Sequence, residues 1–185
     1  MIVRVLVSNI FGISVNRCFL SLGSNIKSRI KFLEFGISEL FKIKKIKINK
    51  ISAVYETPPM HYIEQNKFLN IVLSIETTFN PLQLLKAVKK IEFESGREKT
   101  KQNYPRTLDI DILSYDDITL ETEEIIIPHP RLGDRKFVLQ PWCDIESDFI
   151  LHDCGKSVKE LLKLTRDKSK INKVYDESIF LSYLH

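Results

Sequence analysis

The most informative part of this chain reads Arg106-Thr107-Leu108-Asp109-Ile110-Asp111-Ile112-Leu113. Apolar and acidic residues alternate strictly from Leu108 to Ile112, which predicts a β-strand with one buried face. Asp109 and Asp111 then share the opposite face, roughly 6–7 Å apart along the strand. Aspartate is rare in strands and like charges on one face repel, so the pair predicts a role such as holding Mg²⁺. An ordinary polar outer face is the alternative that this strand alone leaves open.

Apolar periodicity and turn residues predict further elements on both sides of this strand. The expected elements are strands over 18–22, 51–56, 68–77 and 123–127, helices from about 30 to 41 and from 81 to 95, a short helix or irregular apolar segment over 137–145, and a C-terminal helix over 157–164. The basic run Lys42–Lys50 is interpreted as a solvated connection. The order strand, helix, strand, strand, helix, strand predicts an α+β fold. Its core is the ferredoxin-like βαββαβ arrangement, with a C-terminal β/α extension.

A sheet of this kind is mainly antiparallel and carries both helices on one face, so we expect its other face to be open. Asp109 and Asp111 should share that open face with Phe68 and Asn70, because the apolar sides of their strands must turn toward the helices. Arg97, Lys99, Arg106 and His129 can reach the same place from loops. Carboxylates among excess cations suit a metal–polyphosphate complex, whereas an aromatic ring beside an amide suits a flat heterocycle.

Glu92 stands in the last turn of the predicted helix 81–95, where the helix dipole disfavours an anion. A cation or ligand close to Glu92 is expected to account for this placement.

Length and composition limit the class of protein. The 185 residues suit a single domain, expected over 18–168, with an N-terminal extension of unknown role (1–17) and a C-terminal tail (169–185). The formal charge of +4 is too small to indicate a nucleic-acid partner but is compatible with small polyanions. The three cysteines lack the paired spacing of a metal site or a disulfide framework, which fits a reducing cytoplasm. The sequence contains no run of 18 apolar residues, so no membrane span is expected. We expect a cytoplasmic monomer that acts on small molecules.

Several motifs, in order along the chain, resemble the 6-hydroxymethyl-7,8-dihydropterin pyrophosphokinase family. They are Phe19-Leu20-Ser21-Leu22-Gly23-Ser24-Asn25, Tyr55-Glu56-Thr57-Pro58-Pro59, Phe68-Leu69-Asn70, Pro105-Arg106-Thr107-Leu108-Asp109-Ile110-Asp111 and Pro128-His129-Pro130-Arg131-Leu132. The resemblance implies transfer of pyrophosphate from ATP to the hydroxymethyl group of the reduced pterin, with release of AMP, as a step of folate synthesis. It covers about residues 18–142.

The same resemblance implies a role for individual residues. Asp109 and Asp111 would bind two Mg²⁺ ions and, with Arg97 and Arg106, form the catalytic set. ATP would be contacted by Glu92, Arg97, Lys99, Arg106, Ile112, His129 and Arg135, and the pterin by Thr57, Pro58, Met60, Phe68, Asn70 and Phe137.

One loop departs from the family pattern. Relatives usually carry Trp-Gly before the Pro-Arg motif, where this chain has Asn103-Tyr104 and is one residue shorter.

Two other functions compete with this one. An RNA-binding module could use the same open face, although two aspartates there would repel a phosphate backbone. A metabolite-sensing domain without catalysis is the second alternative.

Overall fold

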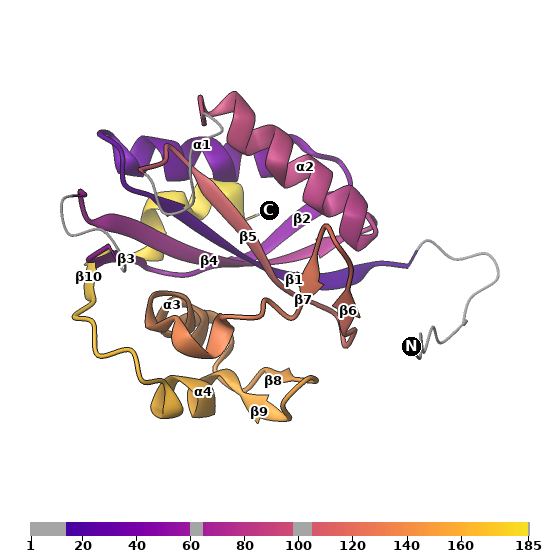
Figure 1. The fold of residues 1–185 in the computed structure, drawn as a ribbon. Helices are drawn as coiled ribbons and strands as arrows, with labels where there is room; N and C mark the ends of the chain where they lie inside the picture. The colour runs from indigo at the N-terminus through magenta and orange to yellow at the C-terminus, as the bar shows by residue number, and fades with distance from the viewer. Residues whose placement is uncertain (1–13, 60–64, 98–104, 185) are drawn as a thin grey trace.

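The computed structural model describes residues 14–59, 65–97 and 105–184, and Figure 1 shows its arrangement. In chain order its elements are β1 (Asn16–Ser24), α1 (Arg29–Lys42), β2 (Ile46–Ile51), β3 (Val54–Thr57), β4 (Phe68–Thr77), α2 (Pro81–Glu94), β5 (Asp109–Tyr115), β6 (Leu120–Glu121), β7 (Ile126–Ile127), η1 (Leu132–Asp134), α3 (Lys136–Glu146), β8 (Ile150–Leu151), β9 (Lys156–Ser157), α4 (Val158–Leu164), β10 (Asn172–Tyr175) and η2 (Glu177–Tyr183). Helices α1 and α2 cover one face of the main sheet, and α3 and α4 lie on the other side (Figure 1). Residues 16 and 17, predicted to belong to the N-terminal extension, begin β1, whereas residues 1–13 lie outside the described part of the chain.

The main sheet is antiparallel throughout, with strand order β10-β3-β4-β1-β5, and β2 also pairs with β4. Strands β2 and β3 therefore lie end to end along β4. They are separated at Ser52, whose backbone N–H donates to the Val72 carbonyl at 2.9 Å and whose hydroxyl accepts from the Val72 N–H at 2.9 Å. The predicted α+β class with an antiparallel sheet is confirmed.

The prediction of a solvated connection over Lys42–Lys50 is wrong from Ile46 onward, where β2 begins. Ile46, Ile48 and Ile51 are buried, while the lysines between them point outward. Ile46 and Ile48 follow the two-residue period of a half-buried strand, and the pairing with β4 shifts register between Ile48 and Lys50, so the next buried isoleucine is Ile51. This irregular spacing and the high charge of the segment are why the strand was not predicted.

The larger hydrophobic core lies between the sheet and helices α1 and α2. Leu22, Ile71 and Ile110 of three adjacent strands contribute to it from the sheet side. Helix α1 packs so closely here that a Cβ at Gly36 would lie 2.9 Å from Leu108 Cδ2, which explains a glycine inside the helix.

The prediction that the second face of the sheet is open is wrong for the part of that face on which helix α3 lies. Helix α3 packs there, and its Trp142 forms a second core with Phe19, Val72 and Leu113 of β1, β4 and β5. Trp142 is fully buried, with its ring centroid 4.7 Å from that of Phe19. At the other end of the same face these strands carry polar residues, which α3 does not cover.

The C-terminal segment, for which the sequence indicated no structure beyond residue 168, completes the domain. β10 pairs with β3 at the edge of the sheet, and the chain then reaches the opposite face, where Phe180 of η2 is buried in the larger core (Figure 1). Within the described residues, no helix combines the length and apolar character needed to cross a lipid bilayer.

Candidate active site

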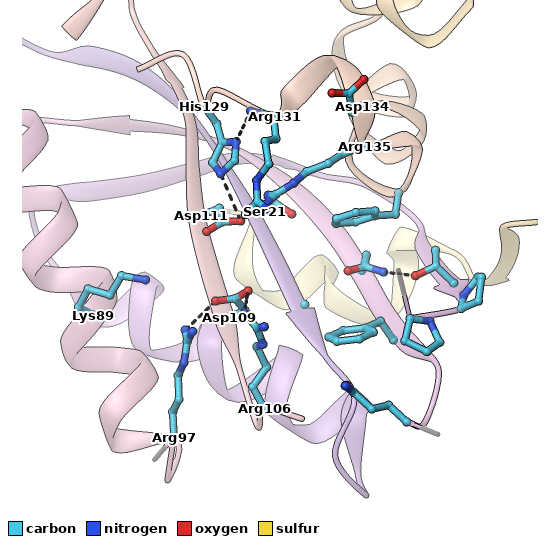
Figure 2. A pocket seen from close by; sticks show the side chains of 18 residues that line it. Ser21, Lys89, Arg97, Arg106, Asp109, Asp111, His129, Arg131, Asp134 and Arg135 are labelled. Atoms are coloured by element: carbon cyan, nitrogen blue, oxygen red, sulfur yellow. Dashed lines mark hydrogen bonds and ion pairs between the residues drawn. The ribbon is translucent and has the colours of Figure 1, made fainter. Parts of the chain in front are cut away.

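A cavity of about 490 Å³ lies on the half of the sheet face that α3 leaves uncovered (Figure 2). Its lining residues are Ser21, Gly23, Thr57, Pro58, Pro59, Gln65, Phe68, Asn70, Lys89, Arg97, Arg106, Asp109, Asp111, His129, Arg131, Asp134, Arg135 and Phe137. Five of these described side chains are lysine or arginine and three are aspartate. The cavity therefore favours a ligand with several negative charges.

The pair Asp109 and Asp111 forms the centre of the cavity wall contributed by β5. Leu108, Ile110 and Ile112 are buried on the opposite side, so the alternation predicted from the sequence is confirmed. Across the sheet, Asp109 faces Gly23 of β1 and Asp111 faces Ser21. The two carboxylates thus project side by side from the face that carries the cavity.

Each carboxylate is bound by cations from outside its own strand. Arg97 Nη1 donates to Asp109 Oδ1 at 2.6 Å, and Arg106 Nη1 donates to Asp109 Oδ2 at 2.5 Å. Arg135 Nη1 donates to Asp111 Oδ2 at 2.8 Å, and His129 Nε2 lies 3.9 Å from the same oxygen (Figure 2). Both acids are therefore already paired with arginine side chains of the protein.

The electrostatic surroundings keep Asp109 ionised. Burial raises the pKa of Asp109, but the charges of Arg106 and Arg97 together outweigh burial and hold the pKa of that carboxyl below its ordinary value. Asp109 is consequently an anion at neutral pH, as a metal-binding carboxylate must be.

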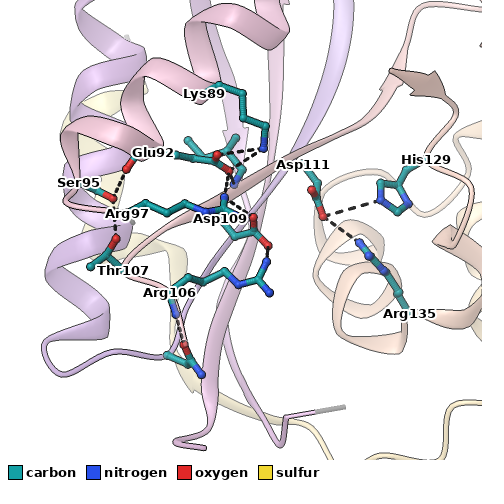
Figure 3. Close-up of polar contacts among 12 residues, drawn as sticks. Lys89, Glu92, Ser95, Arg97, Arg106, Thr107, Asp109, Asp111, His129 and Arg135 are labelled. Carbon is teal, nitrogen blue, oxygen red and sulfur yellow. Dashed lines mark hydrogen bonds and ion pairs between the residues drawn. The ribbon is translucent and has the colours of Figure 1, made fainter. Parts of the chain in front are cut away.

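Glu92 joins three parts of the chain behind this wall (Figure 3). Its side chain is buried, forms ion pairs with Lys89 at 3.0 Å and with Arg97, and accepts from the Ile110 backbone N–H at 2.7 Å. Burial raises the pKa of Glu92 above its ordinary value, although the charge of Lys89 opposes the rise. The cations expected near this acid of the last helical turn are therefore Lys89 and Arg97, and Glu92 holds Arg97 toward β5.

His129 enters the site from the loop after β7. Its backbone N–H donates to the Leu113 carbonyl of β5 at 2.9 Å, which fixes the loop against the strand. The Arg131 N–H donates to His129 Nδ1 at 3.2 Å, so the Nε2 that faces Asp111 carries the proton. Burial lowers the pKa of His129, and the charge of Arg135 lowers it further. The neutral imidazole thus directs its Nε2–H group toward Asp111 Oδ2, which is 3.9 Å away and beyond direct hydrogen-bonding distance.

The opposite side of the cavity is built from aromatic and amide groups, and we call it the aromatic–amide wall: Thr57, Pro58, Phe68, Asn70 and Phe137. Asn70 Nδ2 donates to Thr57 Oγ1 at 2.8 Å, and both residues are buried. A Cβ at position 23 would lie 2.9 Å from Asn70 Oδ1, so Gly23 provides the space that the Asn70 carboxamide occupies. The wall presents two partly exposed rings and a fixed carboxamide, which suits a flat polar heterocycle.

The structure brings together most of the residues that the sequence singled out. Those that line the cavity are Thr57, Pro58, Phe68, Asn70, Arg97, Arg106, Asp109, Asp111, His129, Arg135 and Phe137. Glu92 lies behind the wall, in contact with Arg97. Ile112 does not line it, because its side chain belongs to the larger core. Met60, Lys99 and the Asn103-Tyr104 loop lie outside the described residues.

Sequence reasoning missed several residues of the lining. Lys89 precedes Glu92 by one helical turn, so the (i, i+3) spacing of opposite charges could have indicated it. Ser21 and Gly23 follow Phe19 at the two-residue period of β1, which places them on the cavity face. Gln65 and Arg131 come from irregular segments and Asp134 ends the short helix η1, and none of the three gave a signal of this kind.

The donors present fit hard divalent cations that a substrate helps to bind. Among the described residues, no group of three or more His, Cys, Asp or Glu side chains is arranged to hold a metal. Mg²⁺ requires fewer protein ligands than that, because it is usually bound by one or two carboxylates together with substrate phosphates and water. Asp109 and Asp111 supply that number, beside cations suited to the phosphates.

Comparison with known proteins gives a consistent result. A sequence model of the family described as 7,8-dihydro-6-hydroxymethylpterin-pyrophosphokinase (HPPK) matches residues 19–147. The 2-amino-4-hydroxy-6-hydroxymethyldihydropteridine pyrophosphokinase of Bacillus subtilis is 40% identical over 130 residues, which cover 70% of this chain and 78% of that protein. The enzyme of the same name from Aquifex aeolicus is 39% identical over 142 residues, covering 77% of this chain and 88% of the relative.

Longer relatives contain the same region as a small part. The folic acid synthesis protein fol1 of Schizosaccharomyces pombe is 42% identical over 132 residues, which cover 71% of this chain and 18% of that protein. A solved structure of wild-type Plasmodium falciparum HPPK-DHPS with pterin and p-hydroxybenzoate has the same fold. Its TM-score is 0.63 at 17% identity, and the match covers 81% of this chain and 43% of that one. By its sequence match over residues 19–147, this chain belongs to the 7,8-dihydro-6-hydroxymethylpterin-pyrophosphokinase family.

Proposed function

We propose that this protein transfers the pyrophosphate group of ATP to the hydroxymethyl group of 6-hydroxymethyl-7,8-dihydropterin, releasing AMP, as a step of folate biosynthesis. Family membership supports the reaction. The observation that carries the proposal within this molecule is the position of Asp109 and Asp111. They lie in one cavity with the cations Arg97 and Arg106 and with the aromatic–amide wall. The RNA-binding and sensor alternatives are not favoured.

Two Mg²⁺ ions held by Asp109 and Asp111 together with the ATP phosphates would neutralise charge on the transferring group. Asp109 is positioned for this by β5, and its pKa, held below the ordinary value by Arg106 and Arg97 despite burial, keeps it ionised. The three charges would rearrange when ATP binds, because both arginines now contact the carboxylate that would take the metal.

The cationic side of the cavity would orient ATP. Lys89, Arg97 and Arg106 line the cavity beside Asp109, whereas Arg135 and His129 are beside Asp111. In transfer of a phosphorus group the protein mainly positions the reactants and stabilises the charge that moves onto the bridging oxygen. Arg97 is also held by Glu92, so it can do this without losing its orientation when Asp109 takes the metal.

The aromatic–amide wall would bind the pterin. Phe68 and Phe137 would stack on its two faces, and Asn70, held by Thr57, would hydrogen-bond its edge. Across the sheet Asn70 faces Gly23, which faces Asp109, so the pterin edge and the metal acid are two strand spacings apart, about 10 Å. This separation suits a pterin whose hydroxymethyl group reaches toward Asp109.

We also propose that the core is ferredoxin-like, with β2 and β3 together acting as its second strand and residues after β5 as a β/α extension. The order β5-β1-β4-β3 and the two helices on one face support this class. We propose a single-domain monomer in the cytoplasm. The three cysteines are free thiols, which is consistent with a reducing compartment.

Replacement of either stacking ring tests the pterin pocket. Phe68→Ala and Phe137→Ala are each expected to weaken pterin binding about 5- to 150-fold, because ring stacking contributes roughly 1–3 kcal/mol. Binding of an ATP analogue should change far less. Isothermal titration with both ligands measures this, with the exposed Phe93→Ala as the matched control. Variants that bind pterin normally but lose roughly 3–5 kcal/mol of stability would assign the rings to the core instead.

The proposed reaction is tested by following AMP release from ATP by the full-length chain. AMP should form only when Mg²⁺ and the reduced pterin are both present, because the nucleophile is the pterin hydroxyl group. AMP release that continues at the same rate without pterin would indicate hydrolysis and contradict the proposal.

A further inference from the structure

The start of helix α3 supplies two side chains that line the cavity. Arg135, at the N-cap of α3, directs its guanidinium to Asp111, and Phe137 in the first turn lines the aromatic–amide wall. The guanidinium carbon of Arg135 lies 5.7 Å from the centre of the Phe137 ring. The first backbone N–H groups of a helix need acceptors, and the Arg135 guanidinium, which has only donors, cannot supply one.

Asp167, far along the sequence, provides this missing acceptor. Its Oδ2 accepts from the Lys136 backbone N–H, the first residue of α3, at 3.1 Å. Its Oδ1 accepts from the Ser169 N–H at 2.8 Å, and its own N–H donates to Thr165 Oγ1 at 3.3 Å. Lys136 Nζ also donates to the Ser169 carbonyl at 3.2 Å. Asp167 is thus held in place on both sides, and its negative charge suits the positive end of the helix dipole.

The same segment then reaches the second side of the aromatic–amide wall. β10 pairs with β3 so that Asn172 lies opposite Glu56, the neighbour of Thr57. Residues 165–175, which we call the C-terminal strap, therefore contact both the helix that carries Phe137 and the strand that carries Thr57. The strap lies beyond residues 19–147, the region that matches the family.

We propose that Asp167 is a positioning residue for the pterin: by capping α3 from the strap, it holds Phe137 in the orientation that the ring needs for stacking. The inference rests on the proposed function, because it concerns the same pterin site. Asp167 contacts neither the cavity nor the acids in the described structure, and it acts through the Lys136 N–H.

Loss of the cap should loosen the first turn of α3 while the rest of the helix remains packed. Val138, Leu139 and Trp142 are fully buried and continue to anchor α3 on the sheet. Phe137 is only partly buried, at the margin of the second core, and lies in the turn that Asp167 caps, so its orientation should respond to loss of the cap. When only a fraction of molecules present the ring correctly, the apparent affinity for pterin falls by that fraction.

Three variants of the full-length chain test this role. Asp167→Ala should weaken pterin binding about 2- to 30-fold, the range that corresponds to loss of a helix N-cap. Asp167→Asn keeps an acceptor oxygen and should recover most of the affinity. Asp176→Ala is the matched control, because Asp176 belongs to the same part of the chain but pairs with the half-exposed Lys173 at 2.5 Å. Isothermal titration with pterin and, separately, with an ATP analogue and Mg²⁺ is combined with thermal melting.

Each outcome decides between distinct accounts. Selective loss of pterin affinity in Asp167→Ala, with recovery in Asp167→Asn and no change in Asp176→Ala, supports the positioning role. Unchanged pterin binding in Asp167→Ala overturns it, as does an equal loss for both ligands accompanied by early melting, which indicates a structural role only. Failure of the unsubstituted protein to bind pterin would instead overturn the proposed function, and this inference with it.

Discussion

Asp109→Asn and Asp111→Asn are each expected to lower the rate of AMP formation by orders of magnitude while leaving the fold intact. Each change keeps the size of the side chain and removes the negative charge that would hold Mg²⁺ against the phosphates. Asp109 is held ionised by Arg106 and Arg97 against the effect of burial, so its charge is present at neutral pH. Substitution of an ordinary polar residue on the outer face would change stability by only about 0.5 kcal/mol.

The measurement is the rate of AMP formation over a range of Mg²⁺ concentrations, together with a thermal melt. Asp117→Asn is the matched control, because Asp117 follows the far end of β5 and is well exposed. We expect both site variants to remain folded but to melt somewhat earlier than the unsubstituted protein, because each loses a charge that pairs with arginine, Arg97 and Arg106 for Asp109 and Arg135 for Asp111. Near-normal AMP formation by both variants would show that the pair does not bind the catalytic metals.

Arg97→Ala and Arg106→Ala are expected to reduce turnover roughly 100- to 1,000-fold each, the usual effect of removing one preorganised group that stabilises transition-state charge. Both guanidiniums line the cavity in ion pairs with acids, Arg97 with Glu92 and Asp109, and Arg106 with Asp109. Their contacts should strengthen as negative charge moves onto the leaving AMP. Turnover should therefore fall more than affinity for the nucleotide.

Steady-state kinetics and titration with an ATP analogue separate the two quantities. Lys90→Ala is the control, because Lys90 is an exposed cation on the same helix as Lys89 and pairs with Glu94 at 3.6 Å. Unchanged turnover with weakened nucleotide binding would mean that Arg97 and Arg106 bind ATP equally in the ground state and the transition state.

Local patterns in the sequence predicted correctly which side chains of β5 share a face. The alternation around Asp109 and Asp111 determines which side chains share a face, and this depends only on the two-residue period of a strand. The unfavourable position of Glu92 at the end of α2 likewise predicted a nearby cation, and Lys89 and Arg97 supply it. In both cases the relevant partners follow from short-range geometry.

Features that depend on distant parts of the chain were not predictable in this way. Helix α3 lies on the second sheet face because Trp142 packs against Phe19, which is more than a hundred residues earlier in the chain. No local sequence pattern specifies that contact. The cap that Asp167 provides for α3 and the pairing of β10 with β3 have the same origin. In β2 the lysines between buried isoleucines led to the prediction of a solvated connection. Charged residues on the solvent face are nevertheless compatible with a half-buried strand.

A pyrophosphate group, rather than a single phosphate, is expected to pass from ATP to the pterin. The most direct measurement is the mass of both products after incubation of the full-length chain with ATP, Mg²⁺ and 6-hydroxymethyl-7,8-dihydropterin. We expect AMP and a pterin carrying two added phosphoryl groups, in equal amounts, as transfer of a pyrophosphate group requires. Formation of ADP with a singly phosphorylated pterin, or of AMP with an unmodified pterin, would contradict it.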